Sequence, residues 1–538
     1  MTVFFGKVFW WLLSLGAHAT YVFFRTRRQL HLLQLNSYYN RRYFKWLWRN
    51  KASVFKIKEL EPLWSLGGSL IGGPCLGLIV FILVYLKLVL DPNALKSEKK
   101  PLVFTLRAIR ILVVNLIFLG CIYGGWWICW WYQGDLWFEV AMVGVVGYGF
   151  LIPLILAFAN WLLSPLEWLI QFRYLRKAKK VLGSNSKLIV IGITGSFGKT
   201  TTKYILAELL KRKFNVLKTP GSYNTLMGVT RVILDELKPL HEIFIVEMSA
   251  KRPKDIKKIC DLVNPSVGLI TSIGEQHLEF FKTFDKVVET KSELFGALSG
   301  KDKAFLNLDD PGSKRLVDRF KLPIITYGFL NSHQLPDYYA SELTVGVYGS
   351  RFKITAHRNG QDAVFNTQLL GRHNVHNILG AVSVAVELGV SLSELVTAVR
   401  LIPPVAHRLE LKIIKDEIIF IDDAFNANVI GSKNALEVLA GFVDRRKIIV
   451  TPGLIELGAK ERECNENFGK LLAAVCDYVI LVGKNPGQFL LEGVIKAGYP
   501  KDQLFMATDF NEAMTHLQSL LRPRDVVLFE NDLPDNYS

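Results

Sequence analysis

The chain has 538 residues, more than one hydrophobic core usually holds, and half of them are hydrophobic, with a mean hydropathy of +0.24. The net charge of +17 is concentrated, because residues 1–180 carry 22 of the 65 Lys and Arg but only 7 of the 48 Asp and Glu. A net charge of only +2 remains for residues 181–538, which argues against a nucleic-acid-binding protein, and six cysteines without a CxxC pair argue against a disulfide framework or structural zinc.

Residues 1–180 are predicted to form a transmembrane region, because they contain long apolar stretches. Each stretch is long enough for a bilayer core of about 30 Å, and the first lacks a small-residue cleavage site, so it is predicted to be retained. The four predicted spans are residues 1–24, 66–90, 111–132 and 136–163. We therefore expect a multi-pass protein of a bacterial-type cell membrane, with the lipid bilayer as a partner and the catalytic domains in the cytoplasm.

The topology of residues 25–110 stays open. Three basic segments, 25–58, 87–110 and 173–180, are all predicted on the cytoplasmic side by the positive-inside rule. A full crossing at residues 66–90 places one of them on the wrong side. A re-entrant segment, or an amphipathic piece lying flat within residues 31–50, satisfies the rule.

Residues 181–538 have the pattern of an α/β fold with parallel sheets, in which short Val/Ile-rich runs alternate with helical stretches. The first series of predicted strands comprises KLIVIGIT, EIFIVEM and SVGLITSI, with TTKYILAELLKR as a helix after the first strand. The second series comprises IIFIDD, RKIIVTPG, DYVILVG, QLFMA and DVVLFE. Because a Pro-Pro pair lies at 403–404, we predict an ATP-binding domain over 181–403 and a smaller Rossmann-like domain over 404–538.

The segment GITGSFGKTT, residues 192–201, predicts a phosphate-binding loop, since a strand leads into a glycine turn and then a helix. Lys199 is predicted to contact the β- and γ-phosphates and Thr200 to bind magnesium. Ile193 occupies the position of the usual first glycine, so the motif departs from the standard spacing. The residues predicted to bind the nucleotide here are Thr194, Gly195, Ser196, Gly198, Lys199, Thr200 and Thr201.

Further segments follow this loop in order, and together they resemble the Mur ligase family, in particular its MurF branch, which adds D-alanyl-D-alanine to a cell-wall precursor. The matching segments are TPGSYNTLMGV, IVEMSA, SIGEQHLEFF, ETKSELF, GRHNVHNILGAV, AHRLE, IDDAFNAN and TPGLIELGAKE. The resemblance covers about 340 residues and implies a P-loop domain followed by a Rossmann-like C-terminal domain.

The resemblance also implies roles for individual residues. Glu247 matches a magnesium ligand, His277 a ligand of a second magnesium, and Lys291 a lysine that many members carry in carbamylated form. Asn377 matches the residue that contacts adenine, while Arg408 and Asp423 match C-terminal-domain residues that close on the nucleotide. Three asparagines are expected at the substrate: Asn224, Asn426 and Asn428.

These residues make chemical sense together. Thr200 and Glu247 offer hard oxygen atoms that suit magnesium, and His277 with a carbamate on Lys291 would serve a second ion. Two ions would neutralise both the γ-phosphate of ATP and the attacking carboxylate. The carboxylate would then take the phosphoryl group, and an amine would attack the acyl-phosphate, which leaves ADP, phosphate and an amide. Lys199, His277, Lys291 and Arg408 are the predicted catalytic residues.

The sequence departs from MurF at its front, because the predicted membrane region stands where a MurF ligase has its UDP-sugar-binding domain. We therefore expect a small-molecule or lipid-linked carboxylate acceptor, with an amino acid or dipeptide as the donor. Two other functions stay open: a folylpolyglutamate-synthase-like amino-acid ligase, and a membrane-tethered nucleotide-binding scaffold.

Each single residue also has an ordinary structural explanation. Glu247 is compatible with a helix cap or a surface charge, His277 with a solvated loop residue, and Lys291 with a surface pair beside Glu293. The acidic pairs at 309–310 and 422–423 are compatible with simple turns.

Overall fold

The computed structural model describes residues 2–49, Ile79, Leu83 and 101–531, except 134, 275–280, 331–334, 425–428, 456, 458–459 and 484. The chain forms two compact units, one made by its first 172 residues and a second over Arg173–Leu533. The predicted division of the second unit at residues 403 and 404 stays a prediction.

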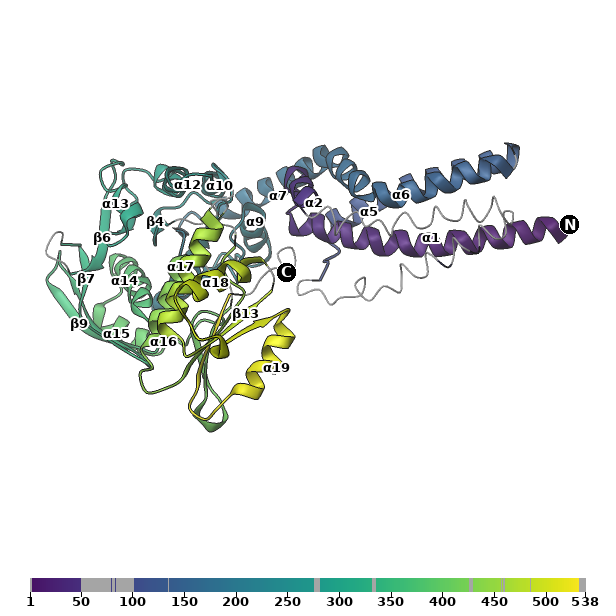
Figure 1. Cartoon of the computed structure of the whole chain (residues 1–538). Helices are drawn as coiled ribbons and strands as arrows, with labels where there is room; N and C mark the ends of the chain where they lie inside the picture. Colours follow the sequence, from purple (N-terminus) through teal and green to yellow (C-terminus); the bar gives the residue numbers. More distant parts are fainter. Residues whose placement is uncertain are drawn as a thin grey trace. The chain divides into compact units, whose positions relative to one another are not determined.

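The first unit is a bundle of long helices that run side by side (Figure 1). Its helices are α1 (Thr2–Leu35), α2 (Asn40–Arg49), α5 (Leu106–Gln133) and α6 (Asp135–Leu162), and α7 (Ser164–Gly183) leads into the second unit. Polar side chains are buried in the bundle. Arg25 donates to the carbonyl of Gly149 at 2.7 Å, and the Tyr148 hydroxyl donates to the Asn115 side chain at 3.0 Å.

The predicted multi-pass location in a bacterial-type cell membrane is wrong. Among the described residues, one helical stretch, Leu106–Gly125, is long and apolar enough to cross a membrane. A second arises only if Gly147–Leu162 and Ser164–Gly183, bent by 47° at their break, count as one span. The helix predicted to end at residue 24 continues to Leu35 with buried Arg25, Gln29 and His31, so it is not the purely apolar span expected. The predicted span at 66–90 lies outside the described residues, apart from two isolated positions.

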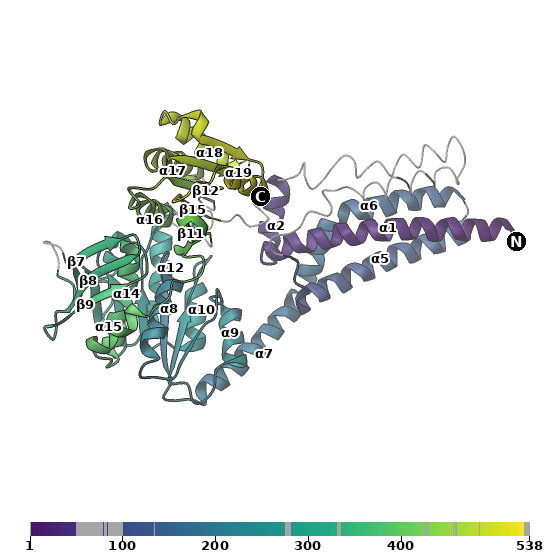
Figure 2. The same ribbon diagram turned by 90° about the horizontal axis from the view of Figure 1, so that it is seen from below.

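The first sheet of the second unit has nine strands in the order β2-β3-β1-β4-β5-β6-β7-β8-β9, and it is parallel from β2 to β7. Its strands are β1 (Ile189–Thr194), β2 (Val216–Lys218), β3 (Ile243–Glu247), β4 (Val267–Ile270), β5 (Lys303–Asn307), β6 (Ile324–Phe329), β7 (Tyr338–Gly346), β8 (Gly349–Ala356) and β9 (Gln361–Thr367). Strand β8 pairs antiparallel with both β7 and β9, and these three strands form one edge of the sheet (Figure 2). The sequence pattern did not predict them.

Helices cover both faces of this sheet, because its central strands are apolar on both sides. Ile191 and Ile193 pack with α8 (Lys199–Leu210), α14 (Arg372–Glu387) and α15 (Leu392–Arg400). Val190, on the opposite face, packs with α9 (Leu226–Asp235), α10 (Asp255–Val263) and α12 (Phe284–Gly296). The short helix α13 (Pro311–Lys314) follows β5. The predicted α/β fold with parallel sheets is therefore confirmed.

A second sheet follows, with six strands in the order β10-β11-β15-β12-β13-β14, parallel except for β10. Its strands are β10 (Glu410–Ile413), β11 (Ile419–Asp423), β12 (Lys447–Thr451), β13 (Tyr478–Val482), β14 (Leu504–Ala507) and β15 (Val526–Glu530). Helices α16 (Val429–Ala440), α17 (Glu461–Val475) and α18 (Asn485–Lys496) pack on one face, and α19 (Phe510–Leu520) packs on the other. All five predicted strands of this part are present.

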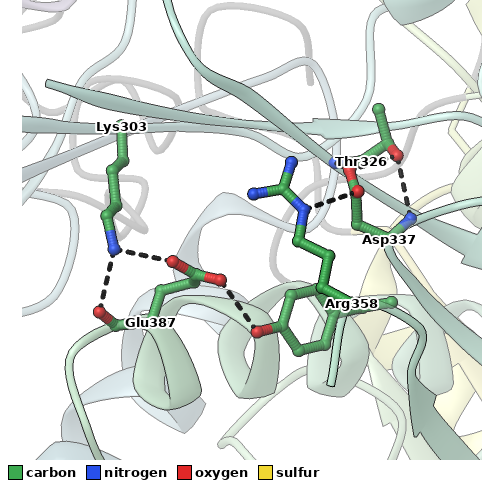
Figure 3. A network of polar contacts seen from close by, with 6 residues as sticks. Lys303, Thr326, Asp337, Arg358 and Glu387 are labelled. Carbon is green, nitrogen blue, oxygen red and sulfur yellow. Dashed lines mark hydrogen bonds and ion pairs between the residues drawn. The ribbon is translucent and has the colours of Figure 1, made fainter. Parts of the chain in front are cut away.

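A polar network fixes α14 against the first sheet (Figure 3). Lys303, at the start of β5, forms an ion pair of 2.6 Å with Glu387 at the end of α14, and the Tyr338 hydroxyl donates to the same carboxylate at 3.0 Å. Asp337 accepts hydrogen bonds from Thr326 and Arg358, each at 2.8 Å. In this parallel part of the sheet the starts of the strands lie at the edge opposite their ends. Lys303 starts β5, whereas the glycine turn follows the end of β1. The network therefore anchors the end of α14 that is remote from the glycine turn.

Candidate active site

The glycine turn between β1 and α8 forms because two glycines occupy positions that no side chain fits. A Cβ atom on Gly195 would lie 2.1 Å from Thr271 Oγ1, and one on Gly198 would lie 2.3 Å from Asn377 Oδ1. Gly198 also has a φ of +76° and gives α8 no side-chain cap. The first backbone amides of α8 are therefore left to meet an anion, as in phosphate-binding loops.

Ile193, which replaces the usual first glycine, is a fully buried residue of β1. The turn proper starts two residues later, at Gly195. The substitution therefore lies in the strand and not in the turn.

The Lys199 ammonium folds back over the turn and donates to the carbonyls of Gly195 and Ser196 at 2.8 and 3.0 Å. Burial lowers the pKa of Lys199 to about 8, although the Glu247 carboxylate opposes this shift. Lys199 is thus a cation held at the mouth of the turn, where a bound phosphate would replace the two carbonyls.

Glu247 ends β3, and its side chain meets the first turn of α8. The Thr200 hydroxyl lies 3.1 Å from each carboxylate oxygen, and the Asn224 amide donates to Oε1 at 3.0 Å. Burial opposes ionisation of Glu247, but the neighbouring Lys203 and Lys199 ammonium groups outweigh it and hold its pKa below the usual value. Glu247 is 1% exposed, which rules out a surface charge.

The oxygen atoms of Thr200 and Glu247 fit a magnesium ion, which prefers hard oxygen donors beside phosphate groups. The sequence interpretation missed one member of this cluster. The Lys203 ammonium forms a buried ion pair of 2.8 Å with Glu247 Oε2. Its position four residues after Lys199 on the same helix was the only signal available.

Lys291, on α12, is 2% exposed, so it is not part of a surface pair with Glu293. Burial shifts its pKa well below the usual value, and the nearby Lys199 ammonium adds to the shift. The Glu293 carboxylate instead accepts the backbone N–H groups of Lys254 and Lys257. Lys291 therefore stands in the same electrostatic environment as Lys199 and Glu247.

Arg408 lies between two residues with left-handed backbone, His407 (φ 58°) and Leu409 (φ 49°). Such a conformation is rare for leucine and requires support from surrounding contacts. That support comes from the end of β11, where Asp422 lies 2.8 Å from His407 Nδ1 and Asp423 accepts the Leu409 N–H at 3.3 Å. Asp422 and Asp423 are therefore strand residues rather than the start of a turn.

Burial raises the pKa of Asp423 to about 7, while the Arg408 guanidinium opposes that rise. Burial likewise lowers the pKa of Arg408, and the carboxylates of Asp423 and Glu247 counteract it. The Arg408 guanidinium thus interacts electrostatically with Asp423, at the end of β11 in the second sheet, and with Glu247, the carboxylate that fits a magnesium ion.

Asn377 contacts the glycine turn from α14. Its Oδ1 accepts from the Thr202 hydroxyl at 3.2 Å, and its amide donates to Asn374 at 3.0 Å. Asn374, which the sequence interpretation did not single out, therefore fixes the orientation of the Asn377 amide.

The structure describes some of the remaining predicted site residues and leaves three others outside the described part of the chain. The Thr194 hydroxyl donates to the Met248 carbonyl at 2.9 Å, the Ser196 hydroxyl to the Gly274 carbonyl at 3.0 Å, and Thr201 is buried in α8. His277, Asn426 and Asn428 lie outside the described residues. Asp310 caps the short helix α13, which agrees with the simple turn considered for residues 309–310. The neighbouring Asp309 carboxylate lies 2.7 Å from His376 Nε2.

Comparison with known proteins identifies two family domains. Residues 193–385 match the Mur ligase middle domain, and residues 407–530 match the Mur ligase glutamate ligase domain. The UDP-N-acetylmuramoyl-tripeptide–D-alanyl-D-alanine ligase of Mycobacterium bovis is 30% identical over 361 residues, which cover 63% of this chain and 70% of that protein. The enzyme of the same name from Bacillus subtilis is 28% identical over 345 residues, covering 63% and 72%.

Solved structures of MurF ligases are also similar to this chain. MurF from Acinetobacter baumannii is similar with a TM-score of 0.61 and 26% identity, over 68% of this chain and 78% of that one. MurF from Thermotoga maritima in complex with ADP has a TM-score of 0.60 and 27% identity, over 67% and 80%.

Proposed function

The chain belongs to the Mur ligase family and is an ATP-dependent carbon–nitrogen ligase, and from this premise we propose that it forms its amide through an acyl-phosphate, as a MurF-like enzyme of peptidoglycan synthesis. The proposed acceptor is the carboxylate of a UDP-linked sugar peptide, and the proposed donor is D-alanyl-D-alanine. These are the substrates for which the relatives are named.

One observation supports this proposal above the others: Glu247 and Lys203 form a buried ion pair directly beside the Lys199 turn, and the partly buried Thr200 contacts the same carboxylate. Such a cluster suits the metal that accompanies a bound nucleotide. A ligase depends on this metal, because two anions, the terminal phosphate and the acceptor carboxylate, must approach each other.

Magnesium would be held by Thr200 and Glu247, and when bound it would supply positive charge to the terminal phosphate and the acceptor carboxylate. A second ion is part of the proposal, with His277 and Lys291 as its ligands. Lys291 would act as a carbamate, since a buried amine of lowered pKa is largely uncharged and its nitrogen is free to attack carbon dioxide. Carbamylation would replace an amine, which has no oxygen atom to offer magnesium, by an anionic oxygen ligand.

The reaction would proceed in two steps. An oxygen of the acceptor carboxylate attacks the γ-phosphorus of ATP, and the bond to the ADP oxygen breaks. The neutral amine nitrogen of the donor then attacks the acyl carbon, the bond from that carbon to the phosphate oxygen breaks, and the extra proton of the nitrogen passes to the departing phosphate. Lys199 and the amides of the turn would orient the γ-phosphate, and Arg408 would balance the negative charge that develops there. Asn377 would contact adenine, Asp423 the nucleotide, and Asn224, Asn426 and Asn428 the substrates.

ADP release by the purified chain tests the proposal. Release that requires ATP, magnesium, UDP-N-acetylmuramoyl-tripeptide and D-alanyl-D-alanine together supports it, and release that needs neither acceptor nor donor contradicts it. A second arm supplies a lipid-linked carboxylate acceptor, because the family domains match only from residue 193 onward. Glutamate with a folate acceptor tests the folylpolyglutamate-synthase-like alternative.

A further inference from the structure

Lys203 is a buried cation that has no assigned role in the two steps of the proposed reaction. Its side chain is 3% exposed, and its ammonium donates to Glu247 Oε2 and to the Gly221 carbonyl, both at 2.8 Å. Lys203 follows Lys199 by one helical turn of α8, but Lys199 contacts the glycine turn instead. The two lysines therefore serve different partners.

The contacts of Glu247 divide its two oxygens between different donors. Lys203 holds Oε2 at 2.8 Å, Asn224 holds Oε1 at 3.0 Å, and Thr200 lies 3.1 Å from both. A carboxylate bound on both oxygens from two elements has little freedom to rotate. The Lys203 ammonium thus helps to hold the carboxylate in the orientation that places both oxygens beside the Thr200 hydroxyl.

Lys203 also fastens the loop over residues 219–224, which connects β2 to α9. Gly221 is held by the Lys203 ammonium and Asn224 by the Glu247 carboxylate, so both parts of the loop depend on the same ion pair. The Glu247 N–H adds a third link, since it donates to Thr219 Oγ1 at 3.2 Å.

We propose that Lys203 is a positioning residue that orients Glu247 for magnesium and couples the loop 219–224 to that carboxylate. The inference rests on the proposed function in one respect, the role of Glu247 as a metal ligand. Partners that orient a metal ligand commonly change metal affinity by about 10- to 100-fold when they are removed.

The inference is tested by whether the removal of the Lys203 ammonium weakens or tightens metal binding. Mn²⁺ replaces Mg²⁺ as the probe and is titrated into the full chain with saturating ADP, while free Mn²⁺ is followed by electron paramagnetic resonance. Lys203→Met should weaken Mn²⁺ binding by about tenfold or more, because Glu247 loses the donor that orients it. Charge repulsion alone predicts the opposite, since removing a nearby positive charge should tighten the binding of a cation. Tighter or unchanged binding by Lys203→Met therefore overturns the proposal.

Matched variants complete the experiment. Lys203→Arg keeps the charge and two donors and should bind Mn²⁺ within about threefold of the wild type. Lys211→Met removes an exposed lysine from the other end of α8, where it pairs with Glu208, and should leave the affinity unchanged. If Lys203→Met does not fold, Lys203→Gln, which keeps one donor, gives the same test of sign.

A second measurement follows the loop itself. Without metal or nucleotide, backbone amides in residues 219–224 should exchange with solvent deuterium faster in Lys203→Met than in the wild type, whereas exchange in β12 should be unchanged. Equal exchange in the loop contradicts the coupling. Glu247→Ala separates the two proposals: if wild-type Mn²⁺ binding does not depend on Glu247, the proposed function fails whatever Lys203 does.

Discussion

The Thr200 hydroxyl lies 3.1 Å from both carboxylate oxygens of Glu247, although 47 positions separate the two residues in the chain. The contact exists because β1 and β3 are parallel neighbours, with Ile193 and Glu247 in register. The helix that follows β1 therefore starts beside the end of β3. This relationship brings a phosphate-binding turn and a metal-binding carboxylate together, and the predictions below depend on it.

Replacement of Lys199 by alanine should reduce turnover by at least about 100-fold, because it removes the charge that would orient the γ-phosphate. The measurement is ADP release with both substrates present. Lys211→Ala, which removes an exposed lysine of the same helix region, is the control and should keep wild-type turnover. Wild-type turnover in Lys199→Ala would refute the assignment of the turn.

Replacement of Lys291 by alanine should also abolish turnover, but here short carboxylates should restore part of it. Acetate or formate fits the space left by the buried side chain and supplies the oxygen ligand that the proposed carbamate provides. ADP release is measured over a range of acetate concentrations. The same carboxylates should leave Lys199→Ala inactive, and equal rescue of both variants would argue against a carbamate on Lys291.

Replacement of Gly198 by alanine should weaken ADP binding by about tenfold or more, because a residue with φ +76° is strained and its Cβ would meet Asn377 Oδ1 at 2.3 Å. Isothermal titration calorimetry measures the dissociation constant. Gly183→Ala is the matched control, since a Cβ at that position meets nothing within 4 Å. A Gly198→Ala variant with unchanged affinity would show that the turn does not hold the phosphates.

The free energy of unfolding of the second unit should decrease as the pH rises, because the buried Glu530 carboxyl group resists ionisation. Burial raises its pKa to about 8, and the Ser432 and Thr451 hydroxyls, which bond to its carboxyl group, only partly oppose that shift. The native state therefore keeps the proton that the unfolded chain loses near pH 4.5. The stabilisation is complete below that pH, declines by up to about 1.4 kcal/mol per pH unit, and is lost once the pH has passed about 8.

Glu530→Gln tests this expectation, since an amide resembles the protonated carboxyl group but does not titrate. Melting temperatures measured between pH 5 and pH 9 should fall less steeply with pH in the variant than in the wild type. Parallel melting curves would mean that Glu530 is ionised in the folded protein at neutral pH.

Local sequence patterns predicted much of the fold. The runs KLIVIGIT and TTKYILAELLKR became β1 and α8, and the five apolar runs from IIFIDD to DVVLFE became strands of one sheet. Such patterns are reliable because burial on a sheet or helix repeats over a few neighbouring residues. Strands β7 to β9 were not among the predicted strands. In β7 a register shift between Ser341 and Thr344 interrupts the pattern. In β8 the alternation is regular, with Phe352, Ile354 and Ala356 buried, so its pattern was overlooked.

The membrane prediction failed for a related reason. Apolar composition alone predicted four spans, whereas α1 continues past its apolar stretch and buries Arg25 against a backbone carbonyl of α6. Hydropathy counts the residues of one segment and takes no account of the neighbours that bury them.

The sequence by itself determined the glycine turn, the strand before it, the helix after it, and the identity of Lys199, Thr200 and Glu247 as candidate site residues. Only the tertiary structure decided that Lys291 is buried, that Asp422 and Asp423 support the backbone around Arg408, and that Lys203 pairs with Glu247. The physical reason is the order of strands. Parallel strands from distant parts of the chain end at one edge of a sheet, so the partner of a charged side chain is set by the packing of strands and not by its neighbours in sequence.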